Sequence, residues 1–169
     1  MRVLGIDPGS QSTGFGIIDS NESGYRVMAF GAIRPSRRLA FHLKLYTIGQ
    51  EIGRIIADHS PDEVVIESPF YAQNIKTAIA LGQVRGAVLM AVAASGCALF
   101  EYSALEIKKA VTSYGQAEKQ QVQAMVKALL NIEGEVEVDA SDALAAAICH
   151  LNTRMYQKTV EKSAGGGGR

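Results

Sequence analysis

Cysteine is scarce in this chain, and the local groupings of residues that form disulfides or zinc sites are absent. The 169 residues include two cysteines, Cys97 and Cys149, which lie far apart in the sequence among small apolar residues. Because they form no CxxC pair, we expect buried thiols in a reducing compartment, and hence a cytoplasmic protein. The histidines at positions 42, 59 and 150 form no local ligand pair.

Long apolar runs and a surplus of one charge are lacking as well. No apolar stretch approaches the roughly 20 residues of a membrane helix, and the N-terminus has no basic region followed by a long apolar one. We therefore expect no membrane span and no signal peptide. The 17 lysines and arginines balance the 17 aspartates and glutamates, so the net charge of zero neither favours nor excludes a nucleic-acid partner.

The charges are nevertheless unevenly distributed along the chain. Between residues 26 and 54 the lysines and arginines are opposed by a single acid, whereas between residues 133 and 142 every charged residue is acidic. This pattern fits either a basic rim around an acidic centre or two separate solvated faces. The residues concerned are the basic Arg26, Arg34, Arg37, Arg38, Lys44 and Arg54 beside Glu51, and the acidic Glu133, Glu135, Glu137, Asp139 and Asp142.

Composition and periodicity predict one α/β domain with a mixed sheet. Hydrophobic residues make up 47% of the chain, which is typical of a folded globular domain. Short apolar runs bounded by turn residues predict strands, and apolar stripes with a helical period predict helices. Their order, βββαβαβααα, predicts a five-stranded sheet with helices on both sides over residues 1–156, followed by a flexible Gly-rich tail at 157–169. The strands are expected at 3–6, 14–19, 25–34, 64–67 and 98–101, and the helices at 39–59, 75–95, from 103, at 117–130 and at 139–156.

The helix predicted over residues 75–95 is apolar almost all round. A helix with so little polar surface is buried either within its own domain or against a partner. The sequence leaves both possibilities open, and a homodimer interface would explain the missing polar face as well as a core position does.

Two of the predicted strands end in a carboxylate. Asp7 follows the apolar run Val3–Ile6, and Glu67 ends the run that starts at Val64. A strand reached through a helix is most simply parallel to its neighbour, so both acids are expected at the same edge of the sheet. Taken alone, Asp7 could instead only open the Pro-Gly turn that follows it.

Two further acids begin the last predicted helix. Asp139 and Asp142 are three residues apart, which puts them on the same helix face. An N-cap role for Asp139 and a favourable interaction of Asp142 with the helix dipole explain the pair in purely structural terms. A capping turn can also present carboxylates to a cleft, so the pair alone does not decide between the two roles.

Taken together, the four acids indicate a divalent-metal site. Converging carboxylates without a histidine base or a cysteine nucleophile would repel one another unless cations were present. Hard oxygen ligands suit Mg²⁺, for which Mn²⁺ can substitute, and two such ions roughly 3.5–4 Å apart would hold the attacking and leaving oxygens of a phosphodiester. In this hypothesis Asp7 bridges both ions and Glu67 completes the shell of one. Asp139 and Asp142 complete the shell of the other ion. A metal-activated water then attacks the phosphorus in line, and the products carry a 5′-phosphate and a 3′-hydroxyl.

Six motifs run collinearly over nearly all of residues 1 to about 155. They are GIDPGSQSTGFG (residues 5–16), VVIESPFYAQN (64–74), ALGQVRG (80–86), FEY followed by KK (100–109), YGQAEKQQVQAMV (114–126) and DASDALAAAICH (139–150). Together they resemble the RuvC family of bacterial endonucleases that resolve Holliday junctions. The resemblance implies a ribonuclease-H-like fold, a homodimer, Mg²⁺-dependent paired nicking of four-way junction DNA, and docking with the RuvA–RuvB branch-migration complex. The catalytic, metal-binding acids that it implies are Asp7, Glu67, Asp139 and Asp142.

The resemblance also implies three DNA-contacting residues. Phe70 matches an aromatic residue that contacts an unstacked base, and stacking on a base is worth about 1–3 kcal/mol in comparable sites. Lys108 and Lys119 match basic residues that support cleavage and contact the DNA backbone. From the residues alone, Phe70 could equally anchor its own loop, and Lys119 could be a solvated surface lysine. The residues around Phe70 depart from the commoner family residues, which leaves the cutting preference open.

Two other functions are compatible with parts of the pattern. The run Asp7-Pro8-Gly9-Ser10 with Gly14 resembles the first phosphate loop of actin-type and sugar-kinase-type phosphotransferases. Those proteins need two lobes and a second phosphate loop, and this chain is too short for both. A DNA-structure-binding protein without catalysis would tolerate replacement of all four acids. Assays of ATP turnover and of junction cleavage distinguish these functions.

Overall fold

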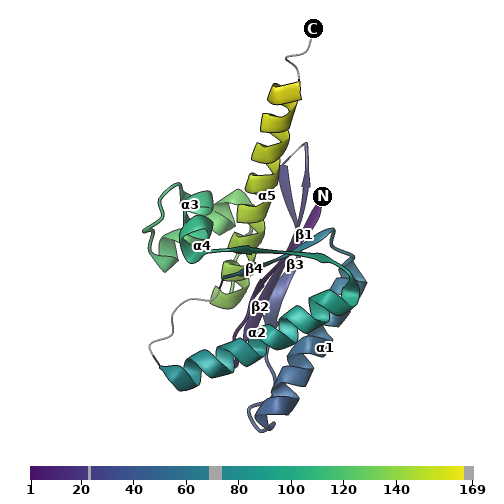
Figure 1. The fold of residues 1–169 in the computed structure, drawn as a ribbon. Coiled ribbons are helices and arrows are strands. Elements are labelled where there is room, and N and C mark those ends of the chain that lie inside the picture. Colours follow the sequence, from purple (N-terminus) through teal and green to yellow (C-terminus); the bar gives the residue numbers. More distant parts are fainter. Residues whose placement is uncertain (23, 69–73, 166–169) are drawn as a thin grey trace.

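A five-stranded sheet forms the centre of the molecule (Figure 1). The computed structural model describes residues 1–22, 24–68 and 74–165. In the strand order β3-β2-β1-β4-β5, the strands β1, β2 and β3 pair antiparallel, whereas β1, β4 and β5 pair parallel. The mixed sheet that the sequence predicts is therefore confirmed. The strands span Arg2–Asp7 (β1), Thr13–Asn21 (β2), Gly24–Ile33 (β3), Glu63–Glu67 (β4) and Ala98–Tyr102 (β5).

Helices cover both faces of the sheet, and each face has its own core. On one face Leu4 and Ile66 pack with apolar residues of α1 and α2. On the other face Val3 and Val65 pack with residues of α3, α4 and α5. Successive strand residues thus point to opposite cores, as the period of a strand requires. The helices span Phe41–His59 (α1), Ile75–Ser95 (α2), Ala104–Thr112 (α3), Lys119–Leu129 (α4) and Val138–Gly165 (α5).

Glycines let the backbone of α5 lie directly on β1 and β2. A Cβ atom added to Gly5 would lie 1.9 Å from the carbonyl oxygen of Ala143, and one added to Gly14 would lie 1.9 Å from that of Asp139. Any side chain at these two positions would push the helix away from the sheet. The first turns of α5 are therefore held against the strand that ends in Asp7.

The last helix is longer than the sequence predicts. It continues to Gly165, whereas the periodic pattern ends near Tyr156. Residues 156–161 are exposed, so no apolar stripe marks this part of the helix, although Gln, Lys and Glu are good helix formers. Residues 157–165 are thus helical, and the flexibility expected of the segment 157–169 stays a prediction.

The helix α2 buries only part of its apolar surface. Val84 and Val88 are buried, but Ile75, Ile79 and Met90 are 78%, 58% and 68% exposed. By length and composition alone, α2 is long and apolar enough to span a membrane. The expectation that no stretch reaches this length and apolarity is therefore wrong. Length and composition do not distinguish a membrane span from a helix that contacts a partner protein.

Candidate active site

The parallel pairing of β1 and β4 places two carboxylates side by side at one edge of the sheet. Ile6 is in register with Ile66, so Asp7 and Glu67, the next residues of the two strands, are neighbours. Asp7 also pairs across the sheet with Gly14, which lies directly beneath the backbone of Asp139. The strand pairing and the close approach of α5 therefore bring the start of the last helix to the end of the first strand.

Burial and mutual repulsion raise the pKa values of three of these acids. The pKa of Asp7 is raised from 3.8 to about 7, first by burial and then by the charges of Asp142, Glu67 and Asp139. The pKa of Glu67 is raised by burial and by Asp142, and burial is also the main cause of the raised pKa of Asp142. Asp7 thus lies close enough to the other three acids for their charges to affect its ionisation.

Lys119 supplies a positive charge to this acidic cluster. It is the first residue of α4, and its Nζ lies 2.7 Å from Oδ2 of Asp142. Burial opposes protonation of the amine, but the hydrogen bond to Asp142 and the charges of Asp142, Asp7 and Asp139 prevail and raise its pKa. Lys119 is thus a surface lysine, 62% exposed, that also pairs with an acid of the cluster.

The lysine is positioned by the way α4 begins. The backbone N–H of Glu118 donates a hydrogen bond to Oε1 of Gln121 at 2.9 Å, which satisfies a free N–H group and helps to fix where the helix starts. Lys108 lies on α3, which begins with a capping box between Ser103 and Glu106. Two capped helices thus deliver the two lysines to the acidic cluster.

A small pocket lies between two of the acids, Glu67 and Asp142, and the two lysines. Its volume is about 200 Å³, and it lies at the junction of β4, α3, α4 and α5. The positive charges of Lys108 and Lys119 oppose the rise in the pKa of Glu67. Because positive and negative side chains share this pocket, it suits a ligand that carries both a phosphate and a cation. The lining residues are Glu67, Ala104, Lys108, Lys119, Val122 and Asp142.

The donor set suits a divalent cation, although its oxygens are not arranged as a finished metal site. Among the described residues, no group of three or more histidine, cysteine or acidic side chains is already placed to hold a metal ion. One oxygen of Asp142 is instead bonded to Lys119. The raised pKa of Asp7 shows how poorly this position tolerates unbalanced negative charge. Carboxylate oxygens are the ligands that Mg²⁺ and Mn²⁺ prefer, so the residues present fit such an ion.

Arg85 is a supporting residue that the sequence interpretation missed. Its Nη1 donates a hydrogen bond to the backbone carbonyl of Glu67 at 2.6 Å, and its Nη2 pairs with Glu101 at 2.6 Å. The side chain is 14% exposed. One signal could have identified it, because Arg85 is a lone arginine in the otherwise apolar helix α2. It connects α2 to the ends of β4 and β5, where the candidate site lies.

Phe70, expected to contact DNA, lies outside the described residues, so its position is not tested.

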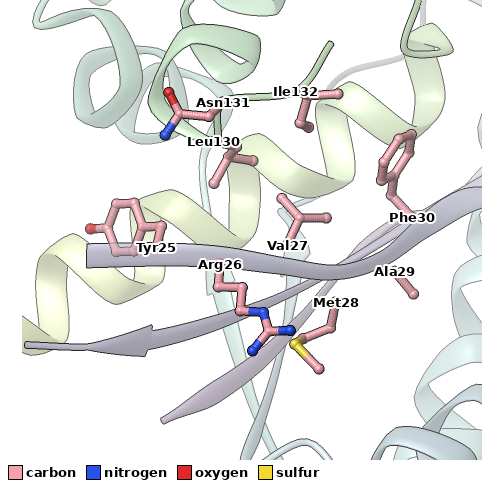
Figure 2. A pocket seen from close by; sticks show the side chains of 9 residues that line it. All are labelled: Tyr25, Arg26, Val27, Met28, Ala29, Phe30, Leu130, Asn131 and Ile132. Carbon is pink, nitrogen blue, oxygen red and sulfur yellow. The ribbon is translucent and has the colours of Figure 1, made fainter. Parts of the chain in front are cut away.

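A separate hollow of about 670 Å³ runs along β3 (Figure 2). There Val27 points toward Leu130 in the turn after α4, while Arg26 and Met28 point to the other side of β3. Tyr25 instead donates a hydrogen bond to Asn152 of α5. None of the four acids is among the described residues that line this hollow.

Known proteins of one family match this chain over almost its whole length. The family model described as "Crossover junction endodeoxyribonuclease RuvC" matches residues 3–150. The RuvC protein of Geobacter sulfurreducens is 43% identical over 160 residues, covering 95% of this chain and 98% of that protein. The RuvC protein of Koribacter versatilis is 48% identical over 165 residues, covering 94% and 99%.

Solved structures agree with the sequence comparison. The structure of Thermus thermophilus RuvC in complex with Holliday junction substrate matches with a TM-score of 0.85 and 26% identity, covering 91% of this chain and 94% of that one. The yeast mitochondrial Holliday junction resolvase Ydc2 shares the fold, with a TM-score of 0.64 and 12% identity over 95% of this chain and 85% of that one. The sequence expectation of a ribonuclease-H-like α/β fold is confirmed. The chain belongs to the RuvC family of crossover junction endodeoxyribonucleases.

Proposed function

We propose that this chain is an endodeoxyribonuclease that resolves four-way (Holliday) DNA junctions by paired hydrolysis of phosphodiester bonds. Water would attack phosphorus, the bond to the 3′ oxygen would break, and the products would carry a 5′-phosphate and a 3′-hydroxyl. The observation that carries the proposal is the convergence of Asp7, Glu67, Asp139 and Asp142 at one sheet edge in a chain of this family.

We further propose that the reaction depends on a divalent cation, Mg²⁺ or Mn²⁺, held by the four acids. When bound, such ions would lower the pKa of the attacking water and stabilise charge on the phosphate. The chain's own residues would hold the cations, and Lys108 and Lys119 would place positive charge where a DNA phosphate enters the pocket. Phe70 would stack on an unpaired base near the junction centre.

The assembly is also part of the proposal. The exposed apolar side chains of α2 would form the interface of a homodimer, and two-fold symmetry would present two active sites to the two strands that must be cut. Docking with the RuvA–RuvB branch-migration complex and a cytoplasmic location are proposed on the family resemblance and the cysteine content.

Replacement of Asp7 by Asn tests the site. With Mg²⁺, the parent protein should nick a synthetic four-way junction and leave linear duplex intact, whereas Asp7→Asn should bind the junction without cutting it. Losing one acid of a cluster that acts as a unit should lower the cleavage rate by at least about a hundredfold. Denaturing gels measure cutting, and gel shifts in Ca²⁺ measure binding.

Asp58→Asn is the matched control, because Asp58 is exposed on α1 and the chemical change is the same. It should cut like the parent. Parental cutting by Asp7→Asn would reject the assignment of Asp7. A parent that cuts no junction but turns over ATP would instead favour a phosphotransferase.

Phe70→Ala tests the proposed base contact. We expect the variant to bind the junction like the parent but to cut it about tenfold more slowly, which corresponds to about 1.4 kcal/mol of lost stacking. Single-turnover cleavage rates give the comparison. Equal rates for variant and parent would remove Phe70 from the reaction.

A further inference from the structure

A buried polar network joins α5 to β4 at the opposite end of the strand from Glu67. His150 is completely buried, and its Nε2 is hydrogen-bonded to the carboxylate of Glu63. Its Nδ1 lies 2.9 Å from the hydroxyl of Tyr102. Arg154 binds both carboxylate oxygens of Glu63, with Nε 2.9 Å from Oε2. The network therefore ties two turns of α5 to the first residue of β4.

The pattern of donors and acceptors fixes the protonation of the ring. The carboxylate of Glu63 can only accept, so Nε2 of His150 carries the proton. Nδ1 then accepts from the hydroxyl of Tyr102, and both ring nitrogens are satisfied. Phe100 packs on this assembly, with its ring centroid 4.6 Å from that of His150 and with the guanidinium of Arg154 also 4.6 Å from it. Such a fully satisfied buried network is directional and allows one arrangement.

The spacing along the two elements connects this network to the acidic cluster. Glu63 and Glu67 are four positions apart on β4, about 13 Å at a strand's rise per residue. Asp142 lies eight positions before His150 on α5, about 12 Å at a helix's rise. Because α5 runs opposite to β4, joining His150 to Glu63 brings Asp142 level with Glu67.

The glycine contacts cannot provide this alignment by themselves. They let α5 approach β1 and β2 closely, but these van der Waals contacts with backbone atoms and with Leu144 lack the directionality by which a hydrogen bond selects one register along the helix axis. A slip of one residue would shift Asp142 by about 1.5 Å and rotate it by about 100°. Either change is large compared with the roughly 0.5 Å to which a functional site must be held.

We propose that His150 and Glu63 are positioning residues that set the register of α5 on β4, and so align Asp142 and Asp139 with Glu67 and Asp7 for divalent-cation binding. Neither residue touches the reacting groups. The catalytic consequence rests on the proposed function, whereas the effect on cation binding can be measured without DNA.

The test compares His150→Leu, which removes both ring hydrogen bonds, with His150→Gln, whose amide N–H can still reach Glu63. Binding of Mn²⁺ to the full-length protein is followed by the electron paramagnetic resonance signal of free Mn²⁺. Junction cleavage is titrated with Mg²⁺ below the unfolding temperature of every variant. For His150→Leu we expect about a tenfold higher Kd for Mn²⁺ and about a tenfold higher half-activating Mg²⁺ concentration, as when an outer partner of a metal site is lost. His150→Gln should recover most of both values, and junction binding in Ca²⁺ should be unchanged.

Asp19→Asn is the control for general stability. It removes the ion pair between Arg2 and Asp19, which lies at the same end of the sheet but does not involve α5. The control should lower Tm and leave the Kd for Mn²⁺ unchanged. If His150→Leu does not fold, Glu63→Gln replaces it, with a shift expected in the same direction.

Each outcome has a distinct meaning. A parental Kd for Mn²⁺ in His150→Leu, or in Glu63→Gln where that variant replaces it, overturns the positioning role. An equal rise in Kd for Asp19→Asn does the same, because the effect would then follow stability alone. A parent that cuts no junction overturns the proposed function, and a parent that binds no Mn²⁺ overturns both proposals.

Discussion

At the scale of single residues, the candidate site holds carboxylates whose burial and mutual repulsion are unfavourable. Asp7 is held in a half-buried position beside three other acids, and its pKa rises to about 7. Part of the stability of the fold is thus given up to keep carboxylates together, as is common where a site must bind a cation. The ion pair between Lys119 and Asp142 offsets some of this repulsion.

The raised pKa of Asp7 predicts how Asp7→Asn changes the stability of the protein with pH. An acid whose pKa is raised by folding destabilises the folded state above its folded pKa, and the effect vanishes below its ordinary pKa. In EDTA at pH 8, where Asp7 is charged, the variant should therefore unfold at a higher Tm than the parent, with a gain of at least about 1 kcal/mol. Toward pH 5 the gain should shrink, because Asp7 is protonated there in the folded parent.

Thermal unfolding followed by circular dichroism at both pH values gives the comparison, with Asp58→Asn as the matched control. Adding Mg²⁺ at pH 8 should raise the Tm of the parent and not that of Asp7→Asn, because only the parent gains from cation binding. If Asp7→Asn were less stable than the parent at pH 8, this would contradict the interpretation that the charge of Asp7 destabilises the folded state.

At the scale of elements, the site depends on α5 lying directly on glycines of the sheet. Gly14→Ala would place a methyl group 1.9 Å from the carbonyl oxygen of Asp139, so the start of α5 must move. We expect a loss of about 1–3 kcal/mol in the free energy of unfolding and a larger loss of junction cleavage than of junction binding. Urea unfolding and cleavage gels measure the two effects.

Gly53→Ala is the matched control for this substitution. Gly53 lies in α1, and an added Cβ would meet no atom within 4 Å, so alanine should stabilise the helix by about 0.5–1 kcal/mol. Gly14→Ala with parental stability and cleavage would show that α5 tolerates a greater distance from the sheet.

The sequence predicts most elements because each has its own local signal. The periodic stripes identify α1 and α2, and apolar runs followed by an acid identify β1 and β4. The glycines beneath α5 carry no comparable signal, since the need for them arises only when two distant segments pack together. The arginine itself stands out in the mainly apolar helix α2, but for the same reason its contact with the carbonyl of Glu67 could not be predicted. Asp7 and Glu67 could be placed together because parallel strands end at the same edge of a sheet, whereas helical spacing put Asp139 and Asp142 on one face without placing that face beside the sheet.

At the scale of the whole molecule, α2 presents an apolar face without a partner in the described chain. Ile75, Ile79 and Met90 lie near one side of the helix by their spacing and are largely exposed. We propose that this face forms the interface of the homodimer. Ile79→Asp should therefore raise the dimer Kd by about tenfold to a hundredfold, as expected when one buried isoleucine is lost.

Light scattering after size exclusion measures the change in mass. Leu105→Asp is the control, because Leu105 is 60% exposed on a different helix, α3, and should leave the assembly unchanged. At concentrations where Ile79→Asp is monomeric, paired cuts should give way to single nicks. A parent that is monomeric at all concentrations would contradict this use of α2.

The order of the elements along the chain also affects when the candidate site can form. On the proposed site, Asp7 and Glu67 leave the ribosome with β1 and β4, whereas Asp139 and Asp142 emerge only later, with α5. A nascent or truncated polypeptide that stops before α5 carries half of the charge cluster and no helix to cover the glycines. On the proposed function, DNA cutting therefore requires that α5 has been synthesised and has packed on the sheet.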